Sequence, residues 1–168
     1  MTSWAGAALR SFVWAAIAAT GTAAAHDAAP RSLIPQAVSA PVMELQQVAA
    51  NVFFVQGVSA LGSPANRNFI SNAGFVITHD SVVVIDALGS PALAEELVQK
   101  IRTLTPKPIS HVLLTHYHAD HIYGLQVFEA LGAKIVAHAQ AREYINSETA
   151  HLRLEASRKD LAPWVDRS

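Results

Sequence analysis

Three histidines and one aspartate lie close together in the segment Thr115-His116-Tyr117-His118-Ala119-Asp120-His121. Neutral imidazole nitrogens and carboxylate oxygens are the usual protein ligands of zinc and related divalent ions. The apolar run Val112-Leu113-Leu114 directly precedes the segment, as is typical of a strand that ends in a loop. A strand that ends in a tight loop can direct all four side chains into one small volume. The segment therefore predicts a metal site.

The spacing within this segment favours two metal ions. Alternate residues of an extended backbone project to the same side, so His116 and His118 can reach one ion. Asp120 and His121 begin the next helix and can reach a second ion nearby. Two ions that share a hydroxide stabilise charge on an attacked carbonyl or phosphoryl oxygen. Asp120 is also a candidate catalytic group that accepts a proton from water or orients it. The alternative is a histidine-rich polar loop without metal.

The elements around the loop are predicted from apolar patterns and punctuating residues. Ser81–Asp86 is a short, nearly all-apolar strand of the kind that is covered on both faces. Ser90–Leu104 has a Ser-Pro start and apolar residues at helical spacing, so it predicts a helix. Ile109–Leu114 is the next strand. A helix then runs from Asp120 through Leu131, with Gly132 as its C-terminal cap.

Further elements complete a mixed fold. The segments Asn51–Gly57, Asn68–Ile77 and Lys134–His138 are rich in β-branched and aromatic residues and predict strands, and the chain from Gln140 onward is predicted to be helical. Hairpins come first, and strands then alternate with helices, which indicates an α+β fold with a mixed sheet. Right-handed crossovers allow both central helices to lie on one face of the sheet.

The N-terminus resembles a secretory signal peptide. Residues 1–25 contain Arg10 as their only charge, then the apolar stretch Ser11–Ala19, and end in the small residues Ala23–Ala25. We expect cleavage there, a periplasmic or secreted protein, and no stable membrane span afterwards. The alternative is an uncleaved anchor or an Ala-rich helix. Residues 26–50 contain three prolines and predict an extended arm, which leaves residues 51–168 for one domain.

Composition narrows the choice of partners and ligands. The chain has no cysteine, so any metal is held by nitrogen and oxygen atoms. Its net charge of −1 gives no electrostatic reason to expect nucleic acid as a partner. Hydrophobic residues make up 51% of the chain and charged residues 15%, which is enough apolar material for a packed core.

The pattern His116-x-His118-x-Asp120-His121 behind an apolar strand resembles the signature of the metallo-β-lactamase superfamily of metallohydrolases. The resemblance runs from about residue 51 to about residue 139 and includes the strand that ends at Asp86. It implies an αββα sandwich, of which this chain holds the N-terminal half, and hydrolysis by one or two metal ions, usually zinc. In the family pattern the two alternating histidines would hold the first ion, the Asp-His pair would hold the second, and Asp86 would support the loop from outside the ligand set.

Finer features of the resemblance point to particular branches. The adjacent pair Asp120-His121 resembles the two-metal branches, such as glyoxalase II-like hydrolases. Together with the export signal, the chain is similar to exported metallohydrolases associated with quinoprotein or sulfur-oxidation systems. β-Lactam, thioester, sulfate ester and phosphodiester substrates all remain open, because loops set the substrate in this fold.

The chain departs from the family pattern after the loop. The family places a third histidine for the first ion, a bridging aspartate and a final histidine in the second half of its fold, whereas this sequence ends at Ser168. The later histidines, His138 and His151, lack the context of those motifs. Two alternatives follow: a metal-dependent hydrolase that is truncated here, or an inactive fragment that binds a metal weakly or needs a second chain or a dimer to complete its site.

Overall fold

A computed structural model describes residues 40–165 of the chain. The predicted signal peptide and most of the predicted arm therefore lie outside the described residues. The elements, in order, are β1 (Leu45–Ala49), β2 (Val52–Val55), β3 (Ala73–Ile77), β4 (Val82–Ile85), α1 (Pro91–Leu104), β5 (Ile109–Leu113), α2 (Ala119–Ile122), α3 (Leu125–Ala130), β6 (Lys134–Val136), α4 (Ala141–Ile145) and α5 (Glu148–Val165).

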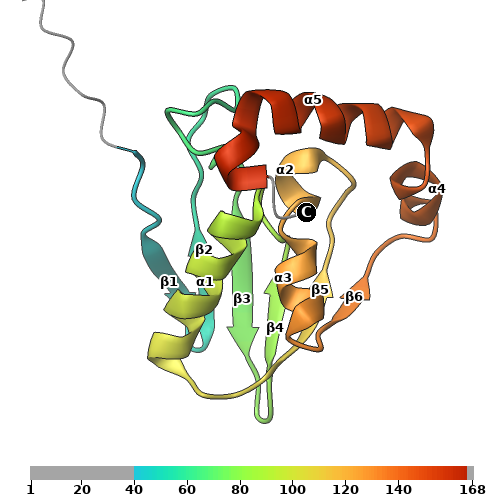
Figure 1. The fold of residues 1–168 in the computed structure, drawn as a ribbon. Helices are drawn as coiled ribbons and strands as arrows, with labels where there is room; N and C mark the ends of the chain where they lie inside the picture. The colour runs from blue at the N-terminus through green and yellow to red at the C-terminus, as the bar shows by residue number, and fades with distance from the viewer. Residues whose placement is uncertain (1–39, 166–168) are drawn as a thin grey trace, which may run out of the picture. The chain divides into compact units, whose positions relative to one another are not determined.

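The strands form one mixed sheet in the order β1-β2-β3-β4-β5-β6 (Figure 1). Strands β1 to β4 pair antiparallel, while β4, β5 and β6 are parallel. Helices α1 and α3 contact each other and lie in front of the sheet in Figure 1. The prediction of hairpins followed by β-α-β units, with both central helices on one face, is confirmed.

Strand β1 was not predicted, because we assigned residues 26–50 to an extended arm. It pairs with β2 at the edge of the sheet, and its register shifts between Gln47 and Ala49. Four of its five residues are exposed, so neither face of the strand is buried. Its sequence, Leu-Gln-Gln-Val-Ala, accordingly lacks the alternation of apolar and polar residues that predicts a strand. Edge strands of this kind give a weak sequence signal, since pairing rather than burial defines them.

The core lies between the sheet and helices α1 and α3. Val82 and Val84 of β4 are fully buried, as are Leu93 and Leu97 of α1 and Phe128 of α3. Helix α1 begins as predicted: the side-chain oxygen of its N-cap serine accepts a hydrogen bond from the third helical N–H, and proline fills the first helical position. This core fixes the strands that carry the histidine loop.

The opposite face of the sheet is apolar but only partly buried. Alternate side chains of the strands point to it, including Val76, Val83 and Ile85, and each keeps some exposure. Leu113 and Val136, which are partners in the β5–β6 register, are 38% and 47% exposed. Exposed apolar area of this extent is typical of a surface that packs against another layer.

The prediction of one helix from Asp120 to Leu131 is wrong, because the chain forms two short helices. The break falls at Gly124, where an added Cβ would lie 2.0 Å from the carbonyl oxygen of Ala87 and 2.7 Å from the Cβ of Ala94. The close approach holds α2 against the end of β4, and only glycine permits it. The predicted cap is confirmed, since Gly132 has a φ of +84° after α3.

The prediction of a strand from Asn68 is wrong over its first five residues. Arg67 and Asn68 have φ values of +57° and +58°, which no strand accommodates. Asn68 is buried, and its side-chain amide donates to the carbonyl oxygen of Gly89 at 2.8 Å. Strand β3 therefore begins only at Ala73, and residues 56–72 form a long loop between β2 and β3.

We predict that Gly124→Ala destabilises the chain by about 1–3 kcal/mol, the usual cost of forcing an extra group into a packed site. The new Cβ would meet backbone oxygen, which cannot move aside without displacing the end of β4. Urea unfolding followed by circular dichroism measures the change. Glu129→Ala, at an exposed position of α3, is the control and should stay within about 0.5 kcal/mol of wild type. Equal stability of Gly124→Ala and wild type would contradict this packing.

Candidate metal centre

Parallel pairing of β4 and β5 brings Asp86 to the histidine loop. Ile85 and Leu113 are partners in register, so both strands end at the same edge of the sheet. Asp86 follows β4 directly, and its N–H donates to the carbonyl oxygen of Leu113 at 2.9 Å. The histidine loop begins at Thr115, two residues after the end of β5, and leads into α2 at Ala119. Residues 86 and 115–121, which are far apart in the sequence, thus lie side by side.

The carboxylate of Asp86 accepts three hydrogen bonds from the loop. Its Oδ1 accepts from the Thr115 N–H at 2.8 Å, and its Oδ2 accepts from the Thr115 hydroxyl at 2.7 Å. The same Oδ2 lies 2.8 Å from Nδ1 of His121. Asp86 is only 5% exposed and has a φ of +61°, so both its backbone and its side chain are committed to this position. The carboxylate supports the first and last residues of the loop together.

This contact shifts the pKa values of both partners. Burial by itself raises the pKa of Asp86, but the hydrogen bonds from His121 and Thr115 outweigh it, so the pKa lies below 3.8. The hydrogen bond to Asp86 raises the pKa of His121 above 6.5, against the opposing effect of burial. In the neutral ring, donation from Nδ1 leaves Nε2 of His121 with the lone pair that can bind a metal ion. That Nε2 lies 3.4 Å from Oδ2 of Asp120.

The remaining histidines gather around the same point. The ring centroid of His116 lies 4.2 Å from that of His121 and 4.6 Å from that of His118. Burial and the neighbouring rings of His121 and His118 lower the pKa of His116, which favours its neutral form. Thr115 Oγ1 lies 2.9 Å from Nδ1 of His116. The structure thus brings together the four side chains singled out in the sequence.

The donor chemistry of this cluster fits zinc, since it offers three imidazoles and one carboxylate and no thiolate. A neutral His116 and a His121 that is oriented by a carboxylate are the forms in which imidazole binds a metal. Within residues 40–165, however, no three side chains of these types are arranged to hold one ion. The four side chains are therefore candidate ligands, and they do not form a complete site by themselves in the described part of the chain.

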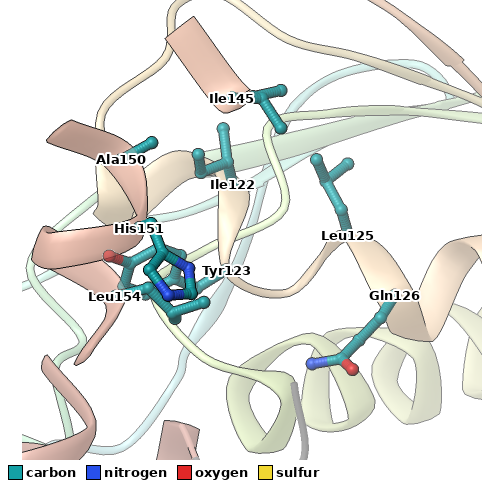
Figure 2. A pocket seen from close by; sticks show the side chains of 8 residues that line it. All are labelled: Ile122, Tyr123, Leu125, Gln126, Ile145, Ala150, His151 and Leu154. Atoms are coloured by element: carbon teal, nitrogen blue, oxygen red, sulfur yellow. The ribbon is translucent and has the colours of Figure 1, made fainter. Parts of the chain in front are cut away.

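Two cavities flank α2 and the loop. A recess of about 220 Å³ borders the loop and is lined by His116, Tyr117, His138, Tyr144 and neighbouring residues. The rings of Tyr117 and Tyr144 are 4.2 Å apart, so α4 packs on the loop there. A second cavity, of about 320 Å³, lies between α2–α3 and α4–α5, and none of the four candidate ligands is among its lining residues (Figure 2).

The later histidines occupy different places. His138 lines the recess beside His116, whereas His151 lines the apolar cavity of Figure 2 and lies 3.2 Å from Glu155 on α5. Neither joins the four-residue cluster in the described part of the chain. Sequence reasoning missed Thr115 and Ser71. Thr115 makes two hydrogen bonds to Asp86, and the hydroxyl of Ser71 donates to the carbonyl oxygen of Asp120.

The chain belongs to the metallo-β-lactamase superfamily. Residues 66–166, more than half of the chain, match the family model described as "Metallo-beta-lactamase superfamily". This finding confirms the family predicted from the histidine signature and the strand that ends at Asp86.

Solved metallo-β-lactamases have the same fold. TMB-1 is 22% identical with a TM-score of 0.51, and the match covers 62% of this chain and 47% of that one. DIM-1, in a crystal exposed to ceftazidime, is 21% identical with a TM-score of 0.52, and 63% and 47% are covered. The enzyme from Pontibacter korlensis is 18% identical with a TM-score of 0.55, and 64% and 49% are covered. The chain thus spans about half the length of these structures, and the predicted fold class is confirmed.

We predict a pH-dependent contribution of the Asp86–His121 pair to stability. A raised His121 pKa stabilises the metal-free fold below pH 6.5, and this contribution is lost as the pH rises through the folded value. The lowered pKa of Asp86 stabilises the fold above pH 3.8, and this contribution is lost as the pH falls through the pKa of Asp86 in the folded chain. The pair therefore contributes most between these two values.

Urea unfolding with a chelator present measures this effect in Asp86→Asn. The loss of stability relative to wild type should be larger at about pH 5.5 than at about pH 9. Asp80→Asn is the matched control, because Asp80 pairs with His79 at an exposed site, where ion pairs contribute little. An equal loss at both pH values would show that His121 is uncharged beside Asp86.

Proposed function

We propose that the chain carries the metal-binding part of a zinc-dependent hydrolase that acts on a small molecule. The observation that carries this proposal is the cluster of His116, His118, Asp120 and His121 above a buried carboxylate that orients one of them. His116 and His118 would hold one ion, and Asp120 and His121 a second. Bound zinc would polarise the substrate oxygen under attack and lower the pKa of water.

The residues of the chain have distinct tasks in this proposal. Asp86 accepts the Nδ1 proton of His121 in a hydrogen bond, which keeps the Nε2 lone pair directed outward. Asp120 Oδ2, 3.4 Å from that nitrogen, would accept the proton of the attacking water. Thr115 holds the loop by two bonds to Asp86, so the ligands have a fixed backbone. Substrate would enter beside His116, where the 220 Å³ recess lies.

The second candidate is a chain that binds metal weakly until a second polypeptide or a dimer partner completes the site. Three observations favour it: the described residues hold no complete set of ligands, the second face of the sheet is only partly buried among them, and the match spans about half the length of the solved relatives. In this proposal one added polypeptide segment would both cover the second face of the sheet and supply the missing ligands, because a site at the edge between two layers draws residues from both.

Export to the periplasm or beyond is part of the proposal. It rests on the sequence of residues 1–25, with one arginine, an apolar stretch and an Ala-Ala-Ala end. Within residues 40–165 no helix combines the length and the apolar character needed to cross a membrane. N-terminal sequencing of the protein from its host tests the cleavage after residue 25.

Metal titration tests the hydrolase proposal directly. We expect the chain to bind zinc weakly, with little hydrolysis of a lactam or thioester, because each ion has two of its ligands here. His118→Ala should weaken cobalt or zinc binding by at least about tenfold, the size of effect seen even for residues that only support a ligand. His79→Ala, at an exposed turn, is the control. Tight binding of two zinc equivalents together with turnover would contradict the expectation that the site is incomplete. Absence of any zinc binding would contradict the proposed metal site.

Size-exclusion chromatography with and without zinc tests completion by a second copy. A dimer that closes the site should form only with zinc and should be lost in His116→Ala. Replacing Val83 by lysine on the open sheet face should also abolish it, because that face would be buried. An oligomeric state that is the same with zinc, without zinc and in both variants would contradict completion by a dimer.

A further inference from the structure

Helix α2, which carries two of the candidate ligands, has little to hold it in place by itself. It has four residues, none of its side chains is fully buried, and its N-cap residue His118 makes no side-chain capping bond. A helix of one turn is unstable in isolation, because fixing the backbone of the first turn costs more free energy than its few hydrogen bonds contribute. The positions of Asp120 and His121 must therefore be fixed by contacts from outside the helix.

Three such contacts are made to the backbone of α2 and the turn that follows it. The Ala87 N–H donates to the carbonyl oxygen of His121 at 2.8 Å, and the Gly124 N–H donates to that of Leu88 at 3.3 Å. The third comes from far away in the sequence: the Ser71 hydroxyl donates to the carbonyl oxygen of Asp120. Ser71 is 4% exposed, so this donor is buried at the contact.

The loop that presents Ser71 is itself held by hydrogen bonds. Asn66 accepts from the N–H groups of Ser63 at 2.9 Å and Asn68 at 3.1 Å, and donates to the Leu61 carbonyl at 2.8 Å. The side chain of Asn68 donates to Gly89, next to the residues that hold α2. Buried amides satisfied in this way fix a loop conformation. The loop and the segment after β4 therefore form one support beneath α2.

We propose that Ser71 is a positioning residue for the metal ligands of α2. Its hydrogen bond fixes the first turn of the helix, and with it the directions of the Asp120 carboxylate and of the His121 ring. It acts through the backbone of Asp120 and touches neither metal nor substrate. This inference rests on the proposed function, because positioning matters there only if α2 holds an ion. The support itself is a property of the metal-free chain and is tested there.

The first experiment uses the full chain without metal. In Ser71→Ala the ¹³Cα chemical shifts of residues 119–122 should move away from helical values, while those of α1 stay unchanged. Ser71→Thr keeps the hydroxyl and should restore them. Ser110→Ala removes a half-buried serine hydroxyl that binds Ser81 Oγ at 2.9 Å elsewhere in the sheet, and it should leave α2 unchanged. Helical shifts that are identical in wild type and Ser71→Ala overturn the proposal.

The second experiment adds cobalt(II) and follows its visible absorption. Ser71→Ala should bind cobalt about 10–100-fold more weakly than wild type, as is usual for residues that orient a ligand. Ser71→Thr should recover most of this affinity, and Ser110→Ala should match wild type. Equal affinity in wild type and Ser71→Ala overturns the positioning role. Failure of wild type to bind cobalt overturns the proposed function instead, and the metal-free shifts then still decide whether Ser71 fixes α2.

Discussion

The contact on which the site depends is the carboxylate of Asp86 beneath the histidine loop. It binds the backbone and hydroxyl of Thr115 at one end of the loop and the ring of His121 at the other. A buried carboxylate is expensive unless it is fully hydrogen-bonded, and this one is satisfied only when both ends of the loop are in place. Burial of this charge is therefore favourable only in the loop conformation that also places the candidate ligands.

The fold explains why that carboxylate sits where it does. Parallel strands end at one edge of a sheet, so the residue after β4 must meet the residues after β5. The chain then bends sharply at Asp86 and Leu88, both with positive φ, and passes close enough to α2 for Ala87 to touch Gly124. Backbone strain of this kind persists only when its surroundings hold it, and it collects at functional sites. Here it lies directly beneath the candidate ligands.

Periodicity and local motifs predicted the elements that the core determines, such as the helix that starts at Ser90. They also predicted that the four candidate ligands lie together, because these residues are close in sequence. The failures share one cause, since each depends on a contact between distant segments. Gly124 reads as an ordinary helical residue until Ala87 is seen beside it, and Ser71 lies 49 positions before the carbonyl that it binds. The edge strand β1 is defined only by its partner β2.

The proposed metal site and the partly buried second face of the sheet are related through the two-layer architecture of this fold. In a two-layer sandwich each sheet buries its apolar face on the other, and a site at the edge between the layers draws ligands from both. Leu113 is 38% exposed and is the last residue of β5. The candidate ligand loop begins two residues later, at Thr115. A layer that covered Leu113 would therefore lie close to the start of the loop that carries the histidines. In the second proposal above, the layer that covers the sheet would also supply the remaining ligands, so metal affinity and stability should rise together.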